Sequence, residues 1–225
     1  MTIKVLRQCR LVRSICLLLG LCLSLFSAAQ IDISTELLSR VENKYGVDGR
    51  LRVEAWKQLL EDPDIKILSV REKLEKVNDF FNQNIDFVDD IFLWGVEDYW
   101  ATPVEFLAQG AGDCEDYSIA KYFTLKILGV PDDKLRITYV KAVELGQAHM
   151  VLTYFETPRS VPLVLDNIIS QIKLATERKD LIPVYSFNGS GLWLAKARGS
   201  GQRVGGSQRL SLWTDLTNRM LQGSL

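Results

Sequence analysis

The spacing of apolar residues changes once along this chain of 225 residues, near Pro131. Before that point the spacing is helical, and it predicts helices at 34–46, 53–62, 65–84, 103–110 and 114–128. After it, runs rich in β-branched and aromatic residues predict strands at 135–143, 149–155, 162–165, 184–187 and 192–197, with a helical patch at 168–178 and a closing helix near 212–220. Helices followed by strands, without strand–helix alternation, predict an α+β domain with an antiparallel sheet.

The first 29 residues differ from the rest of the chain. Residues 4–13 are basic, 15–26 form a 12-residue apolar run, and 27–29 are small. This order predicts a secretory signal peptide over 1–29, with cleavage before Gln30, and it leaves 30–225 as one domain in the periplasm. An uncleaved anchor is disfavoured because a bilayer span needs about 20 apolar residues. A lipid on Cys22 is disfavoured because a bulky leucine precedes that cysteine.

Removal of 29 residues leaves 196, with 23 basic and 28 acidic side chains and a net charge of −5. This charge opposes binding to phosphate backbones and to anionic lipid headgroups, so nucleic acid and membrane surfaces are poor partners. The mature chain keeps one cysteine, Cys114, and one histidine, His149. It can form no internal disulfide, and any cysteine–histidine chemistry has a single possible pairing.

Cys114 opens a predicted helix behind the flexible segment 110–112. A helix N-terminus favours the thiolate, which is the nucleophilic form of cysteine. His149 could accept the thiol proton, and Asp166 could orient the imidazole, which gives a Cys-His-Asp triad. Each residue also has an ordinary interpretation: a small buried hydrophobe for Cys114, a hydrogen-bonded core residue for His149 and a helix cap for Asp166.

Three acids, Asp113, Glu115 and Asp116, lie within two residues of Cys114. Acids are common at helix N-termini, where each adds about 0.3–1 kcal/mol of stability. Here they would raise the pKa of the thiol and oppose thiolate formation. A bound cation would remove this conflict, and an all-oxygen set of ligands suits calcium.

Several ordered motifs resemble one known family. They are DYWATPVE at 98–105, GDCEDY at 112–117, AHMVL at 148–152, LDN at 165–167 and YSFN at 185–188. Together they resemble the bacterial transglutaminase-like cysteine proteinases of the LapG type, over nearly the whole mature chain. The resemblance implies a papain/transglutaminase-like core in which N-terminal helices pack against an antiparallel sheet and the nucleophile begins a helix. The triad positions Cys114, His149 and Asp166 match that pattern without a departure.

The resemblance also implies a function. It implies a calcium-dependent periplasmic endoprotease that cuts the N-terminal region of a large cell-surface adhesin, releases it and so promotes biofilm dispersal. The calcium ligands would be Asp113, Glu115 and Asp116, and the periplasmic domain of an inner-membrane cyclic-di-GMP receptor would restrain the enzyme. Two alternatives stay open from the residues alone. They are transglutaminase-like amide transfer or amidase activity by the same triad, and a non-catalytic binding module.

Overall fold

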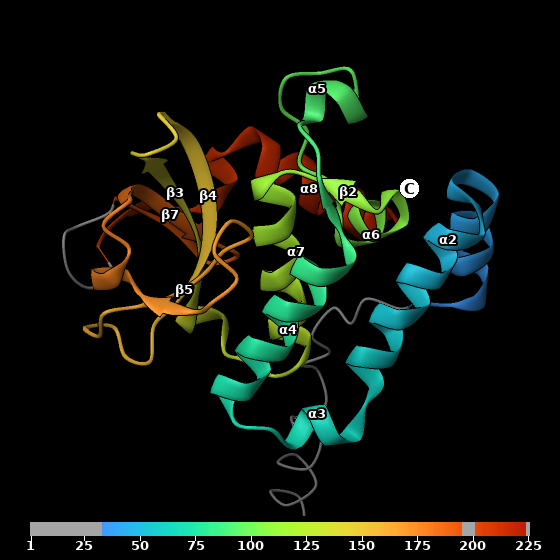
Figure 1. Cartoon of the computed structure of the whole chain (residues 1–225), viewed down its shortest axis with the longest axis horizontal. Helices are drawn as coiled ribbons and strands as arrows, with labels where there is room; N and C mark the ends of the chain where they lie inside the picture. Colours follow the sequence, from blue (N-terminus) through green and yellow to red (C-terminus); the bar gives the residue numbers. More distant parts are fainter. Residues whose placement is uncertain (1–32, 195–200, 224–225) are drawn as a thin grey trace, which may run out of the picture. The chain divides into compact units, whose positions relative to one another are not determined.

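The structure is a computed structural model that describes residues 33–194 and 201–223 (Figure 1). The predicted signal peptide and the end of the strand predicted at 192–197 lie outside the described residues. Within the described ranges, no helix combines the length and the apolar character that a bilayer crossing requires.

The helices precede the main sheet, except for one that closes the chain. They are α2 (Thr35–Glu61), α3 (Pro63–Ile67), α4 (Val70–Asn84), α5 (Asp90–Leu93), α6 (Pro103–Gln109), α7 (Cys114–Ile127) and α8 (Ser211–Gln222). Local signals explain their ends. The Ser69 and Thr102 hydroxyls begin α4 and α6 as capping boxes with Glu72 and Glu105. Gly46 interrupts α2 with a φ of 78°, at the predicted end of the first helix.

The main sheet has seven antiparallel strands in the order β6-β5-β4-β3-β7-β8-β9. The strands are β3 (Leu135–Ala142), β4 (Gln147–Tyr154), β5 (Leu163–Leu165), β6 (Lys173–Leu174), β7 (Leu181–Asn188), β8 (Gly191–Leu194) and β9 (Gln202–Gly205). A separate parallel pair, β1 (Asp86–Phe87) with β2 (Ala111–Gly112), lies immediately before α7.

Helix α7 links the two parts of the fold (Figure 1). It packs against β4 and β3 on one side and against α4 and α6 on another, while α2 packs on α6. Its side chains Ile119, Ala120 and Leu125 are fully buried. The predicted α+β class, with helices against an antiparallel sheet and Cys114 at a helix N-terminus, is confirmed.

Three local predictions were wrong. The helix predicted over 65–84 is divided, because Leu68 and Ser69 adopt extended backbone conformations between α3 and α4. The helical patch predicted at 168–178 instead holds β6 and a 3₁₀ turn at Ala175–Glu177, because Leu174 pairs with Leu163 at the sheet edge. Strand β9 lies in a glycine-rich segment for which no strand was predicted, and it forms by pairing with β8.

Candidate active site and metal centre

Cys114 is held at the first position of α7 by the short segment that precedes it. Helix α6 ends at Gly110, whose φ is 75°, and β2 then pairs with β1. Gly112 has no room for a side chain, since an added Cβ would lie 2.4 Å from Asp116 Oδ2 and 2.6 Å from the Phe106 ring. The chain therefore turns tightly into α7, and Cys114 begins the helix in a fixed position.

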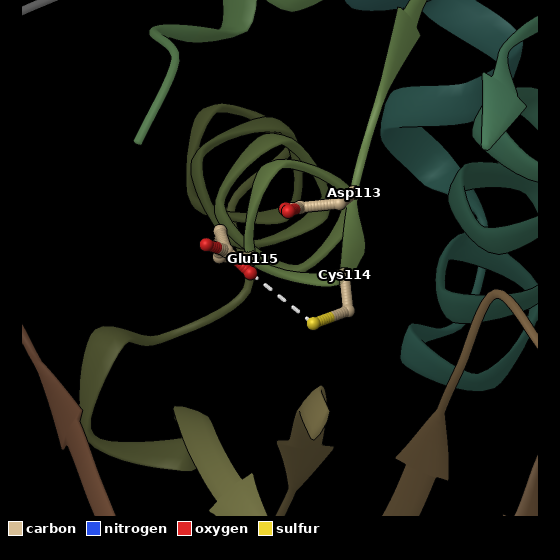
Figure 2. Close-up of side chains that lie close together, drawn as sticks. All are labelled: Asp113, Cys114 and Glu115. Atoms are coloured by element: carbon tan, nitrogen blue, oxygen red, sulfur yellow. Dashed lines mark hydrogen bonds between the residues drawn. The ribbon is translucent and has the colours of Figure 1, made fainter. Parts of the chain in front are cut away.

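The surroundings of the thiol oppose its ionisation. The Cys114 sulfur donates a hydrogen bond to Glu115 Oε2 at 3.1 Å (Figure 2). Burial raises the pKa of the Cys114 thiol well above its ordinary value, and the charges of Glu115 and Asp113 raise it further. A hydrogen bond from the Met150 N–H acts in the opposite direction. As the sequence predicted, the neighbouring acids disfavour the thiolate.

His149 and Asp166 are directly bonded. His149 lies on β4, Asp166 directly follows β5, and the pairing of Leu152 with Leu165 joins these two strands. His149 Nε2 is 2.8 Å from Asp166 Oδ1, and the two side chains are 2% and 0% exposed. The Ile168 N–H also donates to Asp166 Oδ1, at 3.1 Å. The antiparallel register thus brings together two residues that are 17 positions apart in the sequence.

Cys114 and His149 line one cavity of about 880 Å³. Asp113, Glu115 and Asp98 contribute to the same wall, and Asp166 lies behind His149, outside the lining. The Met150 N–H that bonds the Cys114 sulfur comes from the residue after His149, so the thiol lies beside β4. The arrangement offers a nucleophile and a base to a substrate that enters the cavity, with a buried carboxylate behind the base.

Sequence reasoning missed the residues that hold Asp166 in place. Arg178 Nη2 lies 2.7 Å from Asp166 Oδ2, and the Arg178 side chain is 2% exposed. Asn82 Nδ2 and Lys121 Nζ donate to the Asp166 carbonyl oxygen at 2.7 and 3.2 Å. No sequence signal identifies these partners, because they come from α4, α7 and the turn before β7, and only the tertiary fold brings them together.

Sequence reasoning also missed two acids near the predicted metal ligands. Asp90 is 1% exposed, and one of its carboxylate oxygens lies within 4.8 Å of oxygens of Asp113 and Asp116. Asp98 and Glu115 form a similar group with Asp90. The available signal was a pair of acids at 89–90, at the start of a short helix, and it resembles an ordinary helix start.

This acid cluster is poorly compensated by protein groups. Among the described residues, Asp90 Oδ1, Asp113 Oδ1 and Asp116 Oδ2 are buried without a hydrogen-bond partner. Burial raises the pKa of Asp113 to about 9, with Glu115 adding to the effect, and raises that of Glu115 to about 7. Burial also raises the pKa of Asp90 to about 6. Buried, unpartnered carboxylate oxygens in one group fit a hard divalent cation such as calcium.

Comparison with known proteins identifies the family. Residues 61–193 match the family described as bacterial transglutaminase-like cysteine proteinase, BTLCP. Legionella pneumophila LapG, in an EGTA-treated structure, is 47% identical, with a TM-score of 0.72 over 84% of this chain and 98% of that one. Calcium-bound L. pneumophila LapG is 48% identical, with a TM-score of 0.70 over 84% and 99% of the two chains. No curated protein matches the chain. The extent of the family match and the identity to LapG show that this chain belongs to the bacterial transglutaminase-like cysteine proteinases.

Proposed function

We propose that this protein is a calcium-dependent cysteine endopeptidase in which Cys114 is the nucleophile, His149 the general base and acid, and Asp166 the residue that orients His149. The observation that carries the proposal is the 2.8 Å contact between His149 Nε2 and Asp166 Oδ1, directly behind a cavity that Cys114 and His149 both line. With Nε2 engaged by Asp166, the other ring nitrogen is left for proton exchange on the cavity side.

The reaction divides into acylation and deacylation. The Cys114 thiolate attacks the carbonyl carbon of the scissile peptide bond, and the resulting tetrahedral intermediate expels the amine, which takes a proton from His149. Water then gives a proton to His149 and attacks the thioester carbonyl carbon, and the second tetrahedral intermediate releases the carboxylic acid and the Cys114 thiolate, which restores the thiolate and protonated His149 that began the cycle. The buried Asp166 carboxylate accepts the hydrogen bond from Nε2 and stabilises the imidazolium in both stages.

The acid cluster is the proposed calcium site. Asp113, Glu115 and Asp116 are the ligands predicted from the sequence, and the position of Asp90 adds a fourth carboxylate. The calcium-bound and EGTA-treated forms of L. pneumophila LapG support the choice of ion. When bound, calcium supplies the positive charge that the cluster lacks. The Glu115 carboxylate would then cease to favour the protonated thiol.

The substrate and the setting are proposed from the same family membership. The enzyme cuts the N-terminal region of a large surface adhesin in the periplasm, which releases the adhesin and promotes biofilm dispersal. The periplasmic domain of an inner-membrane cyclic-di-GMP receptor holds the protease and restrains it. The basic and apolar N-terminus supports export, with a mature N-terminus at Gln30, and mass analysis of the native protein tests that position.

Cleavage of recombinant adhesin N-terminal fragments tests the endopeptidase proposal. Wild-type protein with calcium should cut such a fragment once, and Cys114→Ala protein should leave it intact. Cleavage by Cys114→Ala at the wild-type rate would overturn the assignment. Amide transfer instead predicts incorporation of a labelled primary amine into a glutamine peptide. A binding module predicts a thiol that reacts with iodoacetamide no faster than free cysteine.

A further inference from the structure

The Asp166 carboxylate is held at both of its oxygens. Oδ1 accepts from His149 Nε2 at 2.8 Å and from the Ile168 N–H at 3.1 Å. Oδ2 forms an ion pair with Arg178 Nη2 at 2.7 Å. A carboxylate held at one oxygen can still rotate about its terminal bond, which is a soft torsion. The positive charge of Arg178 beside Oδ2 opposes that rotation and so favours one direction of the carboxylate toward His149, although the 2.7 Å contact is an ion pair without hydrogen-bond geometry.

Arg178 is itself anchored by a second acid. Its Nε and Nη2 atoms bond the Asp180 carboxylate at 3.0 and 2.7 Å. The Asp180 backbone is fixed in turn, because its carbonyl oxygen accepts the Val143 N–H at 2.8 Å beyond the end of β3. The guanidinium thus hydrogen-bonds Asp180 and places its charge against Asp166, a combination that the compact ammonium of a lysine reproduces less well. Arg178 therefore links the Asp166 carboxylate to the edge of the sheet where β3 ends and β7 begins.

Separate groups fix the backbone of Asp166. Its carbonyl oxygen accepts hydrogen bonds from Asn82 Nδ2 and Lys121 Nζ. Loss of the Arg178 side chain would leave these contacts in place and would release the carboxylate alone. The effect of substituting Arg178 should therefore fall on the orientation and ionisation of Asp166, and much less on the path of the chain.

The charge balance around Asp166 gives Arg178 a second effect. Burial by itself raises the pKa of the Asp166 carboxyl, while His149, the Ile168 N–H and Arg178 lower it, with a net result of about 2. The charged groups that face Asp166 are His149 from β4, Arg178 from the turn before β7 and Lys121 from α7, and Asp180 acts through Arg178. Without Arg178 the buried carboxylate would lose the guanidinium charge beside Oδ2 and would protonate more readily.

We propose that Arg178 is a positioning residue for catalysis, which fixes the Asp166 carboxylate in the orientation that supports His149. This inference rests on the proposed Cys114-His149-Asp166 function. Removing one partner of a buried ion pair also destabilises a fold, so a loss of stability in an Arg178 variant does not by itself separate a structural role from a positioning role. The catalytic role predicts a defect in the behaviour of the thiol that stability loss cannot produce.

The test compares Arg178→Gln and Arg178→Lys with a control at another buried arginine. Arg136 is 6% exposed, and its guanidinium stacks 3.8 Å from the Trp193 ring centroid. Arg136→Gln therefore disturbs a buried arginine on β3 that is not among the residues described above as bonding Asp166. The primary measurement is the rate of Cys114 alkylation by iodoacetamide against pH, in calcium, which needs no substrate. The second is kcat and KM on an adhesin fragment that the wild-type protein cuts.

The alkylation rate of Cys114 falls at low pH, and Arg178→Gln should move this fall to higher pH by about one unit. At a fixed pH within the fall, the variant should therefore react about tenfold more slowly than the wild type. It should lower kcat about tenfold or more and leave KM within about threefold. Arg178→Lys should recover part of each loss. Arg136→Gln should lower the melting temperature and leave the profile and kcat unchanged. An unchanged profile in Arg178→Gln, or losses in both glutamine variants that follow the unfolded fraction alone, would overturn the proposal.

Two further outcomes are also decisive. If Arg178→Gln does not fold, Arg178→Lys decides, and a profile that matches the wild type would overturn the proposal. If wild-type protein cuts no adhesin fragment, or Cys114→Ala cuts as well as wild type, the proposed function fails. The alkylation profiles then still report whether Arg178 controls the Cys114–His149 pair.

Discussion

The Cys114 sulfur lies 3.1 Å from Oε2 of Glu115, the next residue in the chain, and the thiol is the donor in this contact. A thiol that donates to a carboxylate is protonated, whereas the nucleophile in a cysteine protease is a thiolate. The neighbouring carboxylate therefore favours the protonated form of the Cys114 thiol over the thiolate. Occupation of the Glu115 oxygens by a cation removes that acceptor and its charge together.

Calcium should therefore control the reactivity of the thiol itself. We expect iodoacetamide to alkylate wild-type Cys114 at pH 7 about tenfold more slowly in EGTA than in calcium, since one unit of thiol pKa is tenfold in thiolate. Magnesium should restore the rate less well, because it requires a tight octahedron of ligands.

The variant Glu115→Gln separates the effect of the Glu115 charge on the Cys114 alkylation rate from the effect of calcium. In EGTA this variant should alkylate faster than the wild type in EGTA, and calcium should change its rate little. Equal rates for wild-type protein in EGTA and in calcium would show that the acids do not govern the thiol.

The calcium-free protein should lose stability as the pH rises. Burial raises the pKa of Asp90 to about 6, of Glu115 to about 7 and of Asp113 to about 9, so the folded state binds more protons than the unfolded state above about pH 4. This contribution to stability is complete at low pH and is lost as the pH rises through these values. Between pH 5 and 8 in EGTA we expect a loss of several kcal/mol, and a fall in melting temperature on the order of 10 °C or more.

Calorimetry in EGTA and in calcium measures this dependence. Calcium should reduce the pH dependence of the melting temperature, since a bound cation favours the ionised acids. Asp113→Asn should reduce this pH dependence without calcium, because it removes a group whose pKa burial raises to about 9. A melting temperature in EGTA that rises from pH 5 to 8 would contradict the raised pKa values.

Asp90 should be a calcium ligand, although the sequence did not predict it. Its Oδ1 atom is buried without a hydrogen-bond partner among the described residues, and the carboxylate lies with those of Asp113 and Asp116. Asp90→Asn should weaken calcium binding about tenfold or more, because one charged ligand becomes neutral. Titration calorimetry on a Cys114→Ala background measures the affinity. The adjacent exposed residue provides the control, and Asp89→Asn should bind calcium as the wild type does.

The sequence predicted the elements that have strong local signals. The capping box at Thr102 and Glu105, the break at Gly46 and the helix that starts at Cys114 all depend on residues close together in the chain. The short edge strand β6 was missed because its two residues take their conformation from the pairing with β5, which no local pattern encodes.

The same distinction applies to the site. Cys114 and His149 could be proposed because each is the only residue of its type in residues 30–225, and Asp113, Glu115 and Asp116 because they flank Cys114. Arg178 and Asp90 could not be proposed. Each is one of many residues of its type, and the contacts that single it out join segments between 12 and 26 positions apart.

His149→Ala should abolish turnover and leave the fold intact. His149 contributes proton transfer, and loss of a positioned base lowers kcat by about 10²–10⁴-fold. Asp166→Asn should cost less than this or an equal amount, because the Cys114 and His149 side chains remain. Circular dichroism and the cleavage rate of an adhesin fragment are the measurements. His149→Ala that keeps more than about a tenth of wild-type kcat would exclude His149 as the base.

Arg219 on α8 should set both the stability of the fold and the calcium affinity. Its guanidinium bonds Glu105 Oε2 at 2.5 Å, Tyr99 Oη at 2.9 Å and the Trp100 carbonyl oxygen. The segment so held supplies the Tyr99 N–H to Asp90 Oδ2 and the Ala101 N–H to Asp116 Oδ1, at 2.5 and 2.7 Å. The last helix of the chain therefore fixes the backbone that positions two acids of the cluster.

Arg219→Ala should cost about 2 kcal/mol of unfolding free energy, less than a fully buried pair, since the arginine side chain is 18% exposed. It should also weaken calcium binding several-fold, because Asp90 and Asp116 lose part of their preorganisation. Asp215→Ala is the matched control, as it removes an exposed partner of Arg219 and leaves the contacts to Glu105 and Trp100. That change should alter stability by less than about 1 kcal/mol and leave calcium affinity unchanged. Denaturant titration and calorimetry measure the two quantities, and wild-type calcium affinity in Arg219→Ala would mean that the acids hold their positions without α8.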